Sequence, residues 1–187
     1  MMKDYHIGTL DEEGRAALKV EGAQPDAISE TFPEFLEPRR WKKAVLHSKK
    51  SVSWDTRIFS FKLDHDEQTL GLPIGQHLLV RLKHPTTGEM VIRSYTPISP
   101  TEKKGFMDVL VKVYFDTKER KGGKMSQAID ALSVGETVEF KGPVGRFEYL
   151  GAGRCTINDK RRQIKTFILV SGGSGITPIY QVRRILR

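Results

Sequence analysis

The sequence has almost no cysteine and no long hydrophobic run. Its 187 residues include one cysteine, Cys155, which excludes an internal disulfide framework and indicates a reducing, cytoplasmic compartment. No stretch approaches the ~20 apolar residues of a membrane-spanning helix, so no membrane partner is expected. Polar residues follow Lys3, so the first residues lack the apolar core of a secretory signal.

The sequence also lacks the residue patterns of several kinds of catalytic site. Its five histidines show no metal-ligand spacing, and no histidine or second cysteine lies near Cys155. No pair of carboxylates, and no ordered serine, histidine and aspartate, indicates hydrolysis. We therefore expect neither a metal site nor a hydrolytic site in this chain.

Positive charge is in excess, and it is unevenly distributed. The net charge is +8, yet residues 1–38 hold nine acidic and three basic side chains, so the remainder carries +14. Such a basic body is compatible with nucleic-acid binding. However, its basic residues interleave with strand patterns, and no nucleic-acid motif accompanies them. We expect instead a phosphate-rich cofactor or an acidic redox partner, and no nucleic acid.

Composition divides the chain into four segments. Residues 1–10 have the pattern of a last helical turn, and residues 11–40 have the prolines and acidic residues of a linker. Residues 41–152 show short strand patterns, and residues 153–187 change to another class. Within the linker, Phe32, Phe35 and Leu36 are able to dock locally.

Alternating apolar and polar residues in the segment 41–152 predict six short strands and one helix. The strands are expected around Val45–His47 and over Thr56–Leu63, His77–Leu82, Met90–Tyr95, Phe106–Phe115 and Thr137–Lys141, and the helix over Ser126–Leu132. Short strands separated by turn residues predict a mainly β fold, a six-stranded antiparallel barrel.

The last segment has the pattern of a β-α unit. Residues 166–170 form a continuous apolar run, typical of a strand buried on both faces, and a helix is predicted over Thr177–Arg187. A glycine-rich turn, residues 172–175, lies between them, as in the first unit of a parallel nucleotide-binding sheet. One such unit cannot bury its own apolar face, so we expect the chain to be a piece of a longer protein.

Residues 93–97 (Arg-Ser-Tyr-Thr-Pro) join a cation, an aromatic ring and small hydroxyls at the end of a predicted strand. Arg93 offers a planar fork of donors to a diphosphate, and Tyr95, on the same face, offers a flat ring to an isoalloxazine. Thr96 is placed to hydrogen-bond the reactive edge of a flavin. Alone, this stretch fits an ordinary strand with a surface arginine and a turn proline better, and the other motifs favour the flavin interpretation.

Residues 122–126 (Gly-Gly-Lys-Met-Ser) precede the predicted helix. Glycines allow close approach of a ligand to the backbone, and the free amides and positive end of a helix attract phosphate. Ser126 is placed to cap the helix or to donate to a phosphate oxygen. A plain loop with a helix cap is the alternative interpretation.

Two further candidates are Lys112 and Thr177. Lys112 is able to hold a phosphate or a carboxylate, although a solvated residue of the sheet fits its position as well. Thr177 follows the glycine-rich turn, which is not the Rossmann fingerprint because the three-residue step to a last glycine is absent. It is placed to reach a flavin or a nicotinamide diphosphate.

In this order and spacing, the motifs resemble the ferredoxin-reductase-type FAD domain of the cytochrome b5 reductase and nitrate reductase group. The resemblance covers roughly residues 41–187. The family's Arg-x-Tyr-Thr-Pro motif matches residues 93–97, and its Val-Lys-Val-Tyr strand matches residues 111–114. Its Gly-Gly-Lys-Met-Ser and Gly-Gly-x-Gly-Ile-Thr-Pro motifs match residues 122–126 and 172–178.

The resemblance implies a Greek-key barrel that binds FAD and accepts hydride from NADPH or NADH. The cofactor-binding residues it implies are Arg93, Ser94, Tyr95, Thr96, Leu110, Val111, Lys112, Val113, Tyr114, Phe115, Gly122, Gly123, Lys124, Met125, Ser126 and Thr177. Thr96 and Lys112, near the flavin, are the implied catalytic residues.

Within this group, two details favour the eukaryotic, and by our expectation fungal, assimilatory nitrate reductases. Residues 4–8 (Asp-Tyr-His-Ile-Gly) resemble the last helix of a cytochrome b5-type haem domain, and residues 147–160 are similar to nitrate reductases. The resemblance then implies a hinge at residues 11–40, a barrel at 41–152 and the start of an NAD(P)-binding domain at 153–187.

The same resemblance implies partners in cis, a haem domain upstream and the rest of the NAD(P) domain downstream. Haem and a molybdenum-molybdopterin centre would belong to the full-length enzyme only, which is expected to be a homodimer. This segment alone is expected to bind FAD but to be incomplete as a reductase. A cytochrome b5 reductase-like diaphorase and a truncated, non-catalytic flavin-binding module are the alternatives.

Overall fold

The structure, a computed structural model, describes residues 32–186. Its larger sheet consists of β1 (Lys42–Ser51), β2 (Thr56–Lys62), β3 (His77–Lys83), β4 (Met90–Tyr95), β5 (Phe106–Lys112) and β6 (Thr137–Val144), with α1 (Lys124–Asp130) between β5 and β6. These elements confirm the predicted strands and helix, with differences in extent. β1 is longer than predicted, β5 ends at Lys112 rather than at Phe115, and β6 runs on to Val144 rather than ending at Lys141. The helix spans Lys124–Asp130 rather than Ser126–Leu132. The predictions for residues 1–10 and 11–31 lie outside the described residues.

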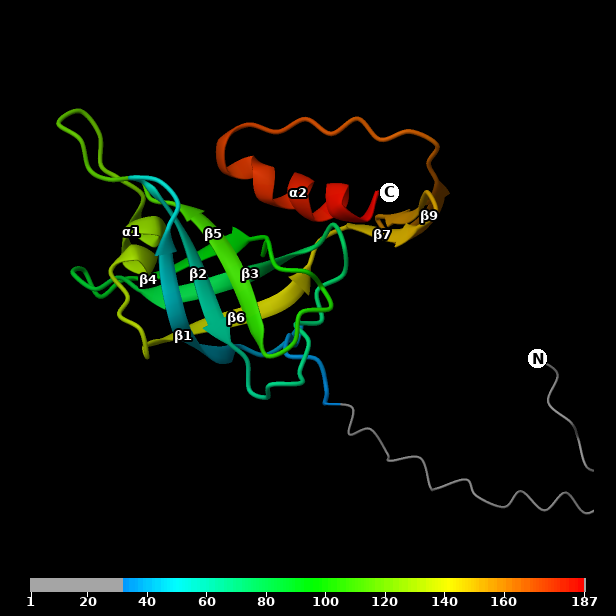
Figure 1. Cartoon of the computed structure of the whole chain (residues 1–187). Coiled ribbons are helices and arrows are strands. Elements are labelled where there is room, and N and C mark those ends of the chain that lie inside the picture. Colours follow the sequence, from blue (N-terminus) through cyan, green and yellow to red (C-terminus); the bar gives the residue numbers. More distant parts are fainter. Residues whose placement is uncertain (1–31, 187) are drawn as a thin grey trace, which may run out of the picture. The chain divides into compact units, whose positions relative to one another are not determined.

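The six strands pair antiparallel in the order β4-β3-β6-β1-β2-β5 (Figure 1). The last strand, β6, pairs with both β1 and β3, so the chain crosses over between hairpins, as in a Greek key. This arrangement confirms the predicted six-stranded antiparallel fold. The two outermost strands are β4, which carries Arg93 and Tyr95, and β5, which ends at Lys112.

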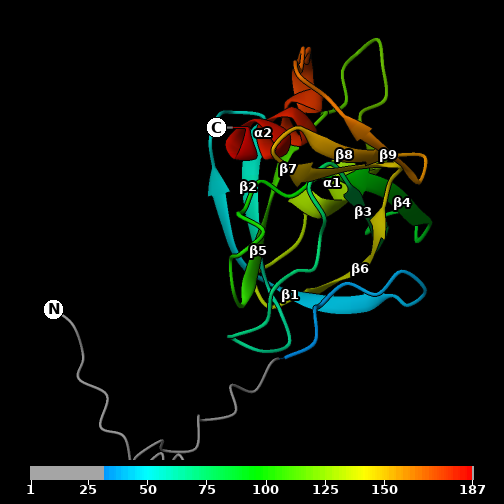
Figure 2. The ribbon, with the colours of Figure 1, turned by 90° about the vertical axis from the view of Figure 1, so that its right-hand side faces the viewer.

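One hydrophobic core lies inside this sheet, whose strands curve around a common interior (Figure 2). Alternate residues of β2, Phe59 and Phe61, point inward because successive side chains of a strand face opposite sides. The Phe61 and Phe140 rings meet edge to face with their centroids 4.9 Å apart. The core thus fixes the strands that present the motif residues.

The segment before β1 docks onto the same body, as its aromatic residues predict. Phe35 is fully buried, and the Phe35 and Leu36 amides donate to the carbonyls of Thr69 and Leu70, both at 3.0 Å. Phe32 stacks on His65 with ring centroids 4.7 Å apart. Residues 32–36 are therefore part of the packed fold rather than free linker.

A second antiparallel sheet, β7 (Phe147–Gly151), β8 (Arg154–Ile157) and β9 (Lys160–Gln163), was not predicted. Its strands are short, and every residue of β9 is exposed, so no alternation marks it. The available signal was the turn between β8 and β9, where Asn158 and Asp159 both adopt positive φ. Such residues favour a two-residue hairpin.

The prediction of a buried strand at residues 166–170 is wrong. This run has no strand assignment, and Ile168 and Val170 are 87% and 83% exposed. A strand needs at least one neighbouring strand to pair with, and none of the strands within residues 32–186 pairs with this run. The predicted helix is present as α2 (Ile176–Ile185), after the short helical turn η1 (Gly173–Gly175).

Helix α2 contacts the turn before β3 and the segment that follows β4. The Gly75 amide donates to Gln181 Oε1 at 2.8 Å. Arg184 Nη1 donates to the Ile98 carbonyl at 3.4 Å, and Val182 is buried. These contacts bring the glycine-rich turn to the barrel.

Candidate functional site

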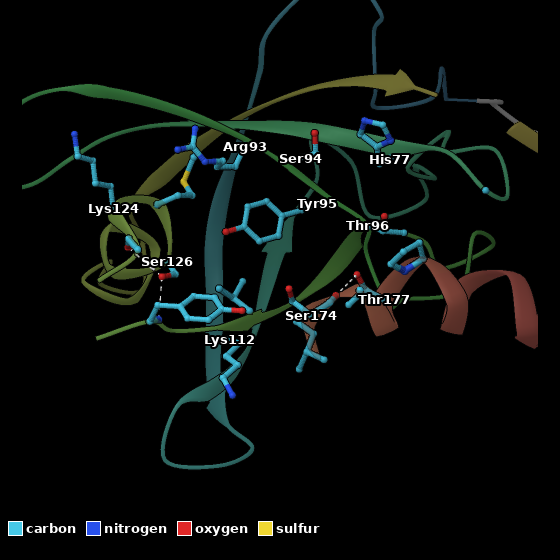
Figure 3. Close-up of a pocket in the computed structure, with 18 residues that line it drawn as sticks. His77, Arg93, Ser94, Tyr95, Thr96, Lys112, Lys124, Ser126, Ser174 and Thr177 are labelled. Atoms are coloured by element: carbon cyan, nitrogen blue, oxygen red, sulfur yellow. Dashed lines mark hydrogen bonds between the residues drawn. The ribbon is translucent and has the colours of Figure 1, made fainter. Parts of the chain in front are cut away.

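A pocket of about 500 Å³ lies where β4, the end of β5, α1 and the start of α2 come together (Figure 3). It collects residues from the motifs at 93–97, 111–114, 122–126 and 172–178, although these are far apart in the sequence. Its lining consists of Gly75, His77, Arg93, Ser94, Tyr95, Thr96, Leu110, Val111, Lys112, Tyr114, Gly123, Lys124, Met125, Ser126, Ser174, Gly175, Thr177 and Pro178.

All but three of the predicted cofactor-binding residues line this pocket. The exceptions have structural surroundings of their own. Val113 is buried, and Phe115 stacks on the exposed Trp54 with ring centroids 6.2 Å apart. Gly122 lies so close to the Tyr114 carbonyl that a β-carbon there would come within 2.2 Å of its oxygen.

Sequence reasoning missed Gly75 and His77 as site residues. His77 begins β3 and Gly75 lies in the turn just before it, and because Leu78 of β3 pairs with Tyr95 of β4, both lie near the Arg93–Thr96 segment. The signal was the glycine-containing turn before β3. Ser174, Gly175 and Pro178 belong to a recognised motif but were not assigned to the site.

β4 presents a cation, a phenol and a hydroxyl to the pocket. Arg93 Nη1 donates to the Ile92 carbonyl at 2.7 Å, and none of the ion pairs within residues 32–186 involves Arg93. Burial raises the pKa of Tyr95 to about 12, so its phenol is neutral at physiological pH. Thr96 is buried, and its hydroxyl takes part in none of the hydrogen bonds found in the described part of the chain.

Lys112 forms an ion pair with Asp55, which directly precedes β2. Its Nζ lies 3.0 Å from Oδ2 of Asp55, and in Figure 3 the lysine extends away from Tyr95. Asp55 is 6% exposed and also accepts from Ser53 Oγ at 2.8 Å and Thr56 Oγ1 at 2.9 Å. The Ser53 hydrogen bond, followed by Lys112, lowers the pKa of Asp55 to about 2.

Asp55→Asn tests this arrangement through pH. The folded pKa lies below the ordinary value of 3.8, so the ionised carboxylate stabilises the fold above that value, and its contribution is lost as the pH falls toward 2. We expect Asp55→Asn to melt at a lower temperature than the parent at pH 7, with the gap closing between about pH 4 and pH 2. Thermal melts across this range measure it. A constant gap down to pH 2 would contradict the assigned pKa.

Ser126 does not cap α1, contrary to one of its two predicted roles. The helix begins at Lys124, its N-cap is Gly123, and no side chain caps it. Ser126 Oγ instead accepts from the Tyr114 amide at 3.1 Å and donates to the Gly123 carbonyl at 3.0 Å. The serine is one turn too far along the helix to cap it, and it ties the end of β5 to the glycines.

The loop before α1 is held by a second set of bonds. Asp116 Oδ1 accepts from the Gly122 amide at 2.6 Å and from Gln127 Nε2 at 3.1 Å, and these bonds lower the pKa of Asp116. Lys124 Nζ pairs with Glu89 Oε2 at 2.7 Å at the exposed rim. The loop therefore has a fixed course beside the pocket, with a cation at its edge.

Within residues 32–186, no group of histidine, cysteine, aspartate or glutamate side chains is arranged to hold a metal ion. In the same part of the chain, no helix has the length and hydrophobicity to cross a membrane.

Comparison with known proteins identifies several relatives. A family model described as "Oxidoreductase FAD-binding domain" matches residues 43–149. The chain is 53% identical to "Nitrate reductase [NADPH]" of Leptosphaeria maculans, over 100% of the chain and 21% of that protein. It is 55% identical to "Nitrate reductase [NADPH]" of Fusarium oxysporum, over 98% of the chain and 20% of that protein.

Among solved structures, the chain is similar to the cytochrome b5 reductase domain of Ulva prolifera nitrate reductase. The two are 42% identical with a TM-score of 0.77, over 82% of this chain and 59% of that one. The chain therefore spans about a fifth of the length of the curated relatives named above.

Proposed function

Because the chain belongs to the oxidoreductase FAD-binding domain family, we propose that its pocket binds FAD and that it serves as the flavin segment of a nitrate reductase. One observation carries the proposal. Residues from four separated motifs line one pocket, and they offer a cation outside any of the described ion pairs, a neutral phenol and a free hydroxyl.

The donor set fits a flat ring bearing a diphosphate. Arg93 supplies the planar fork suited to phosphate oxygens. Lys124 also lines the pocket, with its ammonium paired to Glu89 at the rim. A β-carbon at Gly123 would lie 2.6 Å from Ser126 Oγ, so only glycine fits beside this serine at the pocket wall. The half-buried Tyr95 ring offers a flat surface to an aromatic ligand.

When bound, FAD would supply the redox chemistry, in which a hydride is accepted and single electrons are released. The residues of this chain bind and orient it. The neutral phenol of Tyr95 and the buried hydroxyl of Thr96 are able to donate hydrogen bonds to acceptors on the flavin ring. Asp55 fixes the ammonium of Lys112 at the edge of the pocket. Tyr95 and Thr96 would hold the ring by hydrogen bonds, and Lys112 would place a positive charge at the edge of the pocket.

We extend the proposal to the whole protein from the names of its relatives. NADPH would be the hydride donor, and electrons would pass to haem and then to a molybdenum centre in domains of the same chain, with nitrate as the final acceptor. Coverage of only about a fifth of the relatives leaves room for such domains. The segments 1–10, 11–40, 41–152 and 153–187 belong to the same proposal, with residues 32–36 at the end of the second segment packed on the barrel. The cytoplasmic location and the homodimer belong to it as well.

The test is electron transfer by the full-length product of the gene that carries this segment. Nitrate and ferricyanide reduction would be assayed with NADPH and with NADH. We expect NADPH to support both reactions. Ferricyanide reduction without nitrate reduction would favour a diaphorase, and a flavin-loaded protein inactive in both assays would favour a non-catalytic module.

A further inference from the structure

One hydrogen bond of Gln181 joins α2 to Gly75, a residue that lines the pocket. It is only 6% exposed, although its side chain is polar. Its Oε1 accepts from the Gly75 amide at 2.8 Å, across 106 positions of sequence. Gly75 itself lines the pocket, two residues before His77. Gly75 is only partly buried, whereas the Gln181 side chain is buried, so this bond supplies the partner that the buried carbonyl oxygen of Gln181 needs.

The Gly75 end of this bond is held in place. Gly75 has a φ of +95°, and a β-carbon there would come within 2.3 Å of the Phe147 ring. The neighbouring Ile74 carbonyl accepts from the Tyr149 amide at 2.8 Å, which ties the loop to β7. The loop is therefore a fixed anchor for whatever binds to it.

The other end of the bond sets the position of pocket residues. Thr177 precedes Gln181 by four residues, so the two lie on the same face of α2. Thr177 and Pro178 line the pocket from the first turn of that helix. Anchoring Gln181 fixes the rotation and the axial position of α2, and hence the place of this first turn. Arg184, bonded to Ile98 at 3.4 Å, supports the helix one turn later.

We propose that Gln181 is a positioning residue that holds the first turn of α2, with Thr177 and Pro178, against the flavin pocket. The inference rests on the proposed function and adds the residue that couples the two parts of the site. Gln181 acts here only as an acceptor. A glutamate keeps an acceptor on a side chain of the same length, whereas methionine has similar size and leaves the Gly75 amide without a partner.

The test compares Gln181→Met, Gln181→Glu and Arg183→Ala in the 187-residue chain. Arg183 is the matched control because it is exposed on the same helix and does not line the pocket. The measurements are the FAD dissociation constant, the visible circular dichroism of the bound flavin and the hydrogen exchange of the Gly75 amide. We expect Gln181→Met to weaken FAD binding about tenfold, change the flavin dichroism and speed Gly75 exchange more than tenfold. Arg183→Ala is expected to stay within about twofold of the parent in all three measurements. Gln181→Glu, whose carboxylate still accepts from the Gly75 amide but is partly desolvated, is expected to keep the flavin dichroism and the slow Gly75 exchange of the parent.

The outcomes separate this inference from the proposed function. A parent chain that is folded but binds no FAD would overturn the proposed function, and this inference with it. A parent that binds FAD, together with a Gln181→Met variant of unchanged affinity, dichroism and exchange, would overturn the positioning role alone. A lower melting temperature of Gln181→Met with unchanged flavin dichroism would also overturn it, because that result describes a purely structural contact.

Discussion

Replacing Arg93 with alanine is expected to weaken FAD binding about a hundredfold. Arg93 is the pocket cation best suited to a diphosphate, and it takes part in no ion pair within residues 32–186 that the cofactor would have to break. Two charge-assisted hydrogen bonds contribute about 3 kcal/mol, and each ~1.4 kcal/mol is tenfold in the dissociation constant. Quenching of FAD fluorescence on titration with the protein measures the change.

Two variants sharpen this prediction. Arg93→Lys keeps the charge but loses the planar fork, so it should bind FAD more weakly than the parent and more tightly than Arg93→Ala. Arg162→Ala removes an exposed arginine of β9 outside the pocket and should bind FAD as the parent does. Since the Arg93 side chain is exposed, the fold should survive its loss. Equal affinity of Arg93→Ala and the parent would place the diphosphate elsewhere.

Replacing Gly122 with alanine is expected to displace the loop before α1 and to weaken FAD binding more than tenfold. The added β-carbon would lie 2.2 Å from the Tyr114 carbonyl oxygen and 2.7 Å from the Phe115 carbonyl carbon. These are backbone atoms, which cannot rotate away as a side chain can. The same Tyr114 oxygen accepts from the Gly123 amide at 2.8 Å, so the displacement would reach the glycine that lines the pocket.

The same variant should also lose stability. Overpacking of this kind costs about 2 kcal/mol, which lowers the melting temperature of a domain of this size by about 5 °C. Lys118→Ala, an exposed change in the same loop, is the control and should leave both the melting temperature and FAD affinity unchanged. A Gly122→Ala variant with the parent's FAD affinity would show that the course of this loop does not matter to the site.

The strands of the larger sheet were predictable because each has one face in the core. In β2, for example, buried Phe59 and Phe61 alternate with less buried neighbours, and this period of two is visible in the sequence. β9 has no such period, since all four of its residues are exposed. Its pairing depends on the turn at Asn158 and Asp159, a weaker signal.

The strand predicted at residues 166–170 is absent for a different reason. An apolar run shows which residues favour burial, but it does not show whether neighbouring strands are there to bury them. In the described part of the chain no strand pairs with this run, and Ile168 is 87% exposed. The apolar pattern is typical of a strand in a parallel sheet, but residues 32–186 contain no parallel sheet for it to join.

The candidate site was predictable where it consists of contiguous motifs. Arg93 and Tyr95 lie on β4 and Thr96 directly follows it, and all three were found by their chemistry. The bonds between Gln181 and Gly75 and between Lys112 and Asp55 join residues that are far apart in the chain. No local pattern marks such pairs, because only the folded sheet and helix bring them together.

The most direct measurement of the central claim is a visible absorption titration of the purified 187-residue chain with FAD, alongside Arg93→Ala and Arg162→Ala. The account predicts that the parent and Arg162→Ala take up one FAD per chain, with shifted and better resolved flavin bands. Arg93→Ala should show neither at the same concentrations. A folded parent chain that leaves the spectrum of FAD unchanged would contradict the account.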